Sequence, residues 1–411
     1  MLINLHRLRQ IVFALLITVL CQSWLIYNLM PVTHASSTPH IHWHSPRKVD
    51  VDWSSFGFNS QNTRYNLSEK TLSTLNVRNL KTRWKFHAAT GLETSPIASQ
   101  GILYISAADA KGTFYAINTA SGKLRWSTHF GGPIYATPAI FNNVIYIGVH
   151  PTRDTFGSLF ALDATTGAIL WKTASLGSID YSSPVVSGGF VYVSFDDGNL
   201  YAINANNGRI LWTSPTQSPY STAAVLNGKV YVGAIDGTLY ALNAQTGTTL
   251  WSMPGIPGST SNNSAVVLND VAYLSLFDLF TFNGYFEAFS IKTHKLLWSV
   301  TLTFRAMNSI AVAGNTVYAG LEDGTLYTMN ATTGHKLWSY QTGASIQSAP
   351  AIANGVVYIG STNHNLYAFN ATTGKKLWSY KTKNAISTSS PIVVNGNVYI
   401  GSEDSYLYAF S

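Results

Sequence analysis

ALNAQTGTTLW, residues 241–251, is one copy of a pattern that recurs along most of the chain. The pattern ends in Trp, and in nearly every copy a Gly lies four residues before it. The aligned copies occupy residues 116–126, 161–171, 202–212, 241–251, 288–298, 328–338 and 368–378. An alternating apolar run with a tight turn precedes each copy, as in VYVGAIDGTLY at 230–240. Alternation with period two between short turns predicts antiparallel strands joined by hairpins.

Each unit of about forty residues therefore predicts a meander of four strands, which we name A to D in chain order. One such sheet cannot bury both faces alone, so neighbouring units must cover each other. The indole that ends each D strand is expected to dock on the next unit. The docking residues are Trp84, Trp126, Trp171, Trp212, Trp251, Trp298, Trp338 and Trp378. Glycine fills one turn position in six units, and His294 replaces it in the fifth.

The two ends of the repeat array complement each other. The last unit ends at Ser411 without a D strand of its own, whereas LKTRWKF at 80–86 is a D strand with no preceding A to C. Pairing these two segments completes one sheet and removes the open edges. The sequence thus predicts an all-β protein: an eight-bladed β-propeller of four-stranded antiparallel blades, closed by the N-terminal strand and the last blade.

The region before the repeats differs in composition. Residues 1–10 contain Arg7 and Arg9, and an apolar stretch follows at 11–30. We interpret 1–35 as a signal peptide or an N-terminal membrane anchor, 36–51 as a flexible linker and 52–411 as the propeller. Either form of the leader places the propeller outside the cytoplasm: secreted, periplasmic or anchored to the outer face of the membrane. In the linker His40, His42 and His44 alternate, which suits either a metal site or an exposed spacer.

Composition narrows the function classes. The formal net charge is +7, but the 25 Lys and Arg residues are scattered and no basic run is interleaved with aromatics. This distribution argues against nucleic-acid binding. The single cysteine, Cys21, lies in the leader, so the propeller has no disulfide and no cysteine-based metal or haem site. We expect a monomer with an envelope or extracellular protein as its partner.

The repeat Ala-x-Asn/Asp-Ala-x-Thr-Gly-x-x-x-Trp resembles the tryptophan-docking repeat of pyrroloquinoline quinone (PQQ) dehydrogenases and, equally, that of non-enzymatic propellers typified by BamB. The likeness covers nearly all of 79–411, and DWSSFGFNSQNTRYN at 52–66 resembles the start of quinoprotein alcohol dehydrogenases. The repeat residues perform packing and turn roles, so the resemblance indicates a fold more strongly than an activity.

Variation concentrates on one face of the predicted ring. The A–B and C–D turns are short and uniform, whereas the D–A and B–C connections vary, so the second set is the candidate working face. Aligned D–A connections place one residue per blade at the channel mouth: Glu93, Tyr135, Tyr181, Ser221, Asn262, Met307, Gln347 and Thr388. The candidate cofactor-binding residues at this rim are Glu93, Asp180, Asn262, Asn263, Arg305 and Asn308. They suit a hydrated cation or a quinone carboxylate, or they are the polar lining of any such funnel.

Two B–C connections are longer than the others, at 150–158 and 276–286. The second is rich in Phe and has one charge, Asp278. A projecting loop of this kind would form an apolar partner contact, whereas a folded-back loop would be a lid over the funnel. The candidate contact residues are Phe277, Leu279, Phe280 and Phe282.

Two functions from different classes remain. The first is a non-catalytic binding or scaffold propeller that uses the D–A/B–C face and requires no cofactor. The second is a PQQ- and calcium-dependent dehydrogenase of alcohols or sugars, in which Glu93, Asp180, Asn262 and Asn263 would supply ligands. The resemblance implies a catalytic Asp on the blade after Asn262, but Arg305 and Asn308 stand there. No catalytic residue is assigned, and the first function is favoured.

Overall fold

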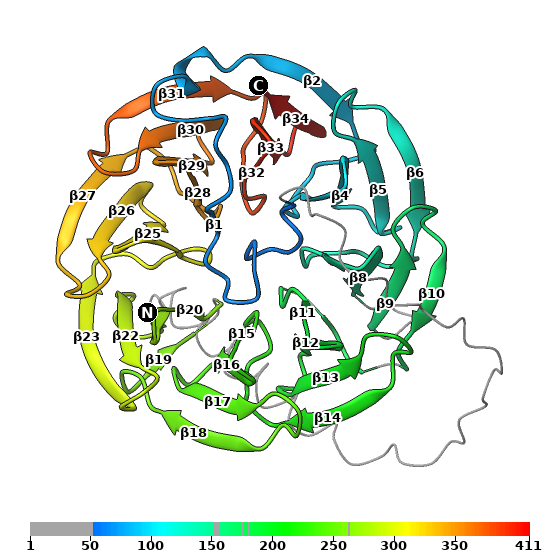
Figure 1. Ribbon diagram of the computed structural model, residues 1–411. Helices are drawn as coiled ribbons and strands as arrows, with labels where there is room; N and C mark the ends of the chain where they lie inside the picture. The colour runs from blue at the N-terminus through cyan, green and yellow to red at the C-terminus, as the bar shows by residue number, and fades with distance from the viewer. Residues whose placement is uncertain (1–51, 151–156, 175, 180, 262–263) are drawn as a thin grey trace, which may run out of the picture. The chain divides into compact units, whose positions relative to one another are not determined.

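The computed structural model describes residues 52–411 except 151–156, 175, 180 and 262–263. These residues form eight sheets, each with four antiparallel strands, arranged as blades around a common centre, which confirms the predicted propeller (Figure 1). The expected leader and linker lie outside the described residues. Among the residues described, the single helix is the short 3-10 helix η1 (Val77–Asn79). No helix in those ranges is long and apolar enough to cross a membrane.

The first four blades each contain four strands in sequence order. Blade 1 comprises β3 (Ile97–Ser99), β4 (Ile102–Ser106), β5 (Thr113–Asn118) and β6 (Leu124–His129). Blade 2 comprises β7 (Ala139–Phe141), β8 (Val144–Val149), β9 (Ser158–Asp163) and β10 (Ile169–Lys172). Blade 3 comprises β11 (Val185–Ser187), β12 (Phe190–Ser194), β13 (Leu200–Asn204) and β14 (Ile210–Ser214). Blade 4 comprises β15 (Ala224–Leu226), β16 (Lys229–Gly233), β17 (Leu239–Asn243) and β18 (Thr249–Met253).

Blades 5 and 7 each gain a short extra strand. Blade 5 comprises β20 (Val266–Leu268), β21 (Val271–Asp278), β22 (Gly284–Ser290) and β23 (Lys295–Leu302), and β19 (Ser259–Thr260) pairs with the end of β21. Blade 6 comprises β24 (Ala311–Ala313), β25 (Thr316–Gly320), β26 (Thr325–Asn330) and β27 (Lys336–Gln341). Blade 7 comprises β28 (Ala351–Ala353), β29 (Val356–Gly360), β30 (Asn365–Asn370) and β31 (Lys376–Lys381), and β1 (Tyr65–Asn66) pairs with β28 in parallel.

Blade 8 closes the ring by joining the two ends of the propeller. It comprises β32 (Ile392–Val394), β33 (Asn397–Gly401), β34 (Tyr406–Phe410) and, as its outer strand, β2 (Thr82–His87). Strands β2 and β34 are antiparallel, with Thr82 opposite Phe410 and His87 opposite Tyr406. The predicted closure is confirmed, and the first and last segments of the propeller are held in one sheet.

The tryptophans that end the D strands lie between blades. In seven of them the indole N–H donates to a backbone carbonyl of the neighbouring blade, at 2.8–3.1 Å. In six contacts the indole covers the turn glycine, so that an added Cβ would lie 2.5–3.0 Å from the ring. The same glycines have positive φ values, for example +71° at Gly208. Glycine is therefore required both for space and for backbone conformation.

An N-terminal segment, residues 53–66, runs through the centre of the ring (Figure 1). We call it the plug. Its carbonyls accept backbone hydrogen bonds from the inner strands of six blades; the donors are Ala98, Ile140, Val225, Val267, Val312 and Ile352. The plug also contacts blade 8, because the side-chain amide of Asn66 donates to the Val393 carbonyl at 2.8 Å. The plug thus satisfies inner-strand N–H groups that would otherwise face the channel.

Arg64, near the end of the plug, is fully buried. Its guanidinium donates to the carbonyls of Pro350 (2.8 Å), Pro391 (2.9 Å) and Phe56. The guanidinium carbon also lies 5.3 Å from the centre of the Trp53 ring and 4.8 Å from the centre of the Phe56 ring. Burial lowers the pKa of Arg64 to about 9, so the group remains charged at neutral pH. Carbonyl dipoles and aromatic faces balance this charge and tie blades 7 and 8 to the plug.

Candidate functional site

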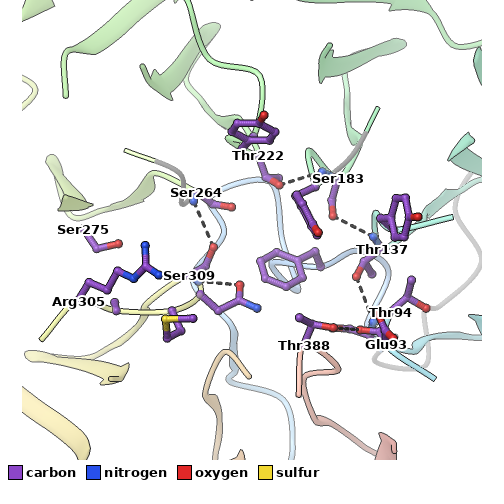
Figure 2. A pocket seen from close by; sticks show the side chains of 18 of the residues that line it. Glu93, Thr94, Thr137, Ser183, Thr222, Ser264, Ser275, Arg305, Ser309 and Thr388 are labelled. Carbon is purple, nitrogen blue, oxygen red and sulfur yellow. Dashed lines mark hydrogen bonds between the residues drawn. The ribbon is translucent and has the colours of Figure 1, made fainter. Parts of the chain in front are cut away.

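A cavity of about 470 Å³ opens on the face that carries the D–A and B–C connections. Phe56 of the plug is among its lining residues, so the plug contributes to the wall of the cavity. The other lining residues come from D–A connections and from the end of β21 (Figure 2). The cavity therefore lies on the face that the sequence indicated as the working face.

Three of the six candidate rim residues line this cavity: Glu93, Arg305 and Asn308. Figure 2 shows Arg305 on one side, reaching towards the interior, and Glu93 across the cavity from it. The remaining three candidates, Asp180, Asn262 and Asn263, lie outside the described residues. The structure thus brings together one carboxylate, one guanidinium and one amide from blades 1 and 6.

A ring of hydroxyl groups lies just inside the cavity. In six blades a backbone N–H donates to the Ser or Thr hydroxyl of the next blade, at 2.9–3.3 Å. The hydroxyl acceptors are Ser95, Thr137, Ser183, Thr222, Ser309 and Ser390, and several of these bonds are visible in Figure 2. Because these oxygens are engaged in holding adjacent A strands together, their primary role is structural.

Glu93 lies in an electrostatically unfavourable position. Burial raises the pKa of its carboxyl group, and the nearby Glu403 carboxylate raises it further. Thr388 donates to the backbone carbonyl of Glu93 at 2.7 Å, which fixes the main chain and not the carboxylate. A carboxylate of this kind favours a proton or an incoming positive charge.

Arg305 is fixed by two contacts. Its Nε donates to the Glu322 carboxylate at 3.2 Å, and its guanidinium carbon lies 4.4 Å from the centre of the Phe277 ring. The neighbouring Asn308 is committed to the scaffold, because its amide donates to the Gln347 carbonyl at 3.0 Å and accepts from the Ser309 N–H at 2.7 Å. Arg305 is therefore the one cationic side chain of the described cavity lining, and its guanidinium is held in place.

Three tyrosines form one wall of the cavity: Tyr135, Tyr181 and Tyr220, from the D–A connections that precede blades 2, 3 and 4. The ring centres of Tyr135 and Tyr181 are 6.1 Å apart, and those of Tyr181 and Tyr220 are 6.2 Å apart. We call this row the tyrosine wall. The alignment of the D–A connections places Tyr135 and Tyr181 at the channel mouth. Neither is among the candidate cofactor-binding residues, because those candidates were ligands for a cation or a quinone. The recurrence of tyrosine on successive blades was the signal that could have identified the wall.

The Phe-rich segment expected as a loop over 276–286 is mostly strand. Strands β21 and β22 extend through it and leave a short turn at 279–283. Phe277 lies in β21 and lines the cavity, whereas the turn exposes Leu279 (58%), Phe280 (84%) and Phe282 (58%). We call 279–282 the hairpin tip. The base of the segment thus lines the cavity wall, and its tip is open to solvent.

PQQ and calcium make specific demands on a binding site. Calcium takes six to eight oxygen ligands, usually with several carboxylates. The described lining of this cavity supplies a single carboxylate, Glu93. Within the described ranges no three His, Cys, Asp or Glu side chains gather closely enough to hold a metal ion. Among the described lining residues, Arg305 is the single cationic side chain that could face an anionic quinone. For a calcium–quinone pair the described lining thus supplies one carboxylate and one guanidinium, while the candidate ligands Asp180, Asn262 and Asn263 lie outside the described residues.

The fold, the tryptophan docking and the plugged channel define an eight-bladed propeller of the PQQ-like repeat class. The chain belongs to the family described as outer membrane protein assembly factor BamB, whose model matches residues 68–154, 155–278 and 282–411. The resemblance derived from the repeat is thereby confirmed. A comparison with curated protein sequences gives no match.

Solved structures share the fold at low sequence identity. BamB from Moraxella catarrhalis is 20% identical, with a TM-score of 0.68 over 81% of this chain and 99% of that one. Quinohemoprotein alcohol dehydrogenase from Comamonas testosteroni is 16% identical, with a TM-score of 0.72 over 88% and 80%. The computationally designed Ika8 protein is 18% identical, with a TM-score of 0.69 over 80% and 99%. Since an assembly factor, an enzyme and a designed protein all match, the fold alone does not determine the activity.

Proposed function

We propose that this chain is a non-catalytic binding propeller, located outside the cytoplasm, that recruits a protein partner through its D–A/B–C face. The observation that carries the proposal is the exposure of the hairpin tip, with Phe280 84% exposed, beside a cavity that contains a fixed arginine and a tyrosine wall. An exposed apolar group of this kind is typical of protein interaction sites.

The composition of this face supports a polypeptide partner. Tyr, Phe, Met and Arg are enriched in protein interfaces, and Tyr and Arg are prominent among the few residues that supply most of the binding free energy. Tyrosine offers a large amphipathic surface at low conformational entropy cost, and Ser and Asn add adaptable hydrogen bonds. The cavity lining and the hairpin tip together contain all of these residue types.

The family match supports the proposed location and the type of partner. The family description names a factor that assembles outer membrane proteins. A factor of that kind works in the cell envelope and acts on other proteins. The apolar stretch at 11–30 is consistent with export of the propeller.

Substitution of the hairpin tip tests the proposal. We expect Phe280→Ser with Phe282→Ser to reduce the amount of cross-linked envelope protein recovered with the propeller by about tenfold or more, because two central apolar contacts are lost. A matched control is Leu124→Ser with Leu337→Ser, since these leucines are 48% and 49% exposed on the outer strands β6 and β27. Equal recovery for both double variants and the parent protein would overturn the proposal.

The dehydrogenase interpretation has its own test. We expect a titration of the purified protein with PQQ and Ca²⁺ to show neither saturable binding nor dye-linked oxidation of alcohols or sugars, because the described donor set lacks the necessary carboxylates. Saturable binding with turnover would reverse the order of the two functions.

A further inference from the structure

The cavity has two walls of different chemistry. One wall holds the Arg305 guanidinium against Phe277, and another consists of the tyrosine wall. A ligand that fills the cavity therefore meets a fixed positive charge and a row of amphipathic rings. These two features specify the chemistry of the partner segment more narrowly than the exposed hairpin tip does.

Arg305 is preorganised to receive a carboxylate. Glu322 takes the Nε edge of the guanidinium at 3.2 Å, and Phe277 covers one of its faces. Among the described residues the guanidinium makes no further hydrogen bond. The remaining edge can therefore donate two parallel hydrogen bonds to an incoming carboxylate, the geometry that makes arginine selective for this group. Glu322 acts as the positioning residue that fixes the orientation.

The tyrosine wall favours a flat or branched apolar side chain. Tyr135 and Tyr181 are 37% and 58% exposed, so their rings are accessible from the cavity mouth. Ring planes in the row are inclined by 36° and 56°, so the row presents both ring edges and ring faces. Aromatic pairs in such offset or edge-on arrangements gain binding free energy beyond simple burial.

A basic ligand is the competing possibility, since Glu93 lies near Glu403 on the other side. Only the backbone of Glu93 is fixed by a described hydrogen bond, from Thr388. Holding a flexible carboxylate in one position upon binding costs side-chain entropy, whereas the guanidinium of Arg305 has already lost its freedom. Preorganisation therefore favours the acidic ligand.

We propose that the cavity binds a segment of the partner polypeptide in which an Asp or Glu lies close in sequence to an aromatic or aliphatic residue. The acidic side chain pairs with Arg305, and the apolar side chain packs against the tyrosine wall. This inference rests on the proposed binding function and assigns the cavity as its specificity-determining region.

Selection from a phage-displayed library of random peptides tests the inference on the full chain. We expect enriched peptides to combine an acidic and an apolar residue, and to lose enrichment when Arg305→Gln replaces the parent protein as bait. Arg305→Lys should retain partial binding, because it keeps the charge but loses the paired hydrogen bonds. A synthetic copy of one selected peptide with its acidic residue changed to the amide should bind about tenfold or more weakly to the parent protein. That measurement does not depend on how any variant folds.

The outcomes separate this inference from the proposed function. Peptides that carry Lys or Arg, or that bind equally well to Arg305→Gln, would overturn the acidic-segment inference. If such peptides still depend on Phe280 and Phe282, the proposed binding function stands without it. If no peptide is enriched, the inference fails, and the cross-linking comparison decides the proposed function separately.

Discussion

Blade 3 and blade 5 occupy equivalent places in the repeat, yet they differ at the positions that determine stability. In blade 3 the turn glycine Gly208 receives the indole of Trp171, and the Tyr201 hydroxyl donates to the Asp197 carboxylate at 2.5 Å. In blade 5 the equivalent positions hold His294 and Glu287. Blade 5 also carries the long β21–β22 hairpin. The regular blade keeps the packing residues of the repeat, whereas the irregular blade departs from them, and of its three departures only the long hairpin lies at the candidate site.

The docking contact between Trp251 of blade 4 and blade 5 has fewer stabilising features than the docking contacts of the other tryptophans. Trp251 of blade 4 packs against the His294 ring, with ring centres 4.7 Å apart. Its indole Nε1 is buried without a hydrogen-bond partner among the described residues. His294 adopts a φ of +54°, which a residue with a Cβ adopts less readily than glycine. Blade 5 therefore joins the ring through a contact that lacks both the hydrogen bond and the glycine.

The largest expected effect comes from removing a complete docking contact. Trp212→Ala should destabilise the ring by about 3–5 kcal/mol, because it removes a 9% exposed indole and its hydrogen bond to the Ala244 carbonyl. Trp251→Ala should cost about 1 kcal/mol less, since no hydrogen bond is lost there. Thermal melting of both variants measures the difference. Equal melting temperatures for Trp212→Ala and the parent would contradict the docking role.

The next largest effect is expected at Glu287, whose carboxyl group is buried in blade 5. Glu287 is 2% exposed where seven other blades have an aromatic residue, and burial raises the pKa of its carboxyl group to about 7. Its folded-state pKa thus exceeds the unfolded value of 4.5, so stability is lost as the pH rises between these two values. Glu287→Gln should stabilise the protein by up to about 3 kcal/mol at pH 8 and by almost nothing at pH 4.

Melting curves at several pH values check this prediction. Gln can keep a hydrogen bond to Ser299, the opposite residue on β23, so the comparison isolates the ionised state. A gain that is the same at pH 4 and pH 8 would show that packing, and not ionisation, is responsible.

A smaller effect is expected from the turn position itself. Gly208→Ala should cost about 1–3 kcal/mol, because the new Cβ would lie 2.5 Å from the Trp171 ring at a φ of +71°. His294→Ala is the matched substitution in blade 5, where a Cβ is already present, and should cost less than about 1 kcal/mol beyond its lost ring contact. Chemical denaturation measures the free energy of unfolding of both variants, and equal losses would show that the two turns do not differ in this way.

The repeat was sufficient to predict the propeller, the number of blades and the closure, because each depends on local periodicity and on the Trp and Gly positions of every unit. The plug was not predicted. Its role depends on hydrogen bonds between 53–66 and strands far along the chain, and no local pattern reports them. The burial of the Glu287 carboxyl likewise has no local sequence signal, whereas the recurrence of tyrosine on successive D–A connections could have indicated the tyrosine wall. Single rim residues such as Glu93 and Arg305 do line the cavity, since the repeat fixes where each connection lies.

The pairing of β2 with β34 also determines when blade 8 can form during synthesis of the nascent chain. Strand β2 is among the first segments of the propeller to leave the ribosome, and its partner β34 is among the last. At roughly 5–20 residues per second, the wait is on the order of tens of seconds. During that time β2 presents an unpaired edge, which is a hazard for aggregation.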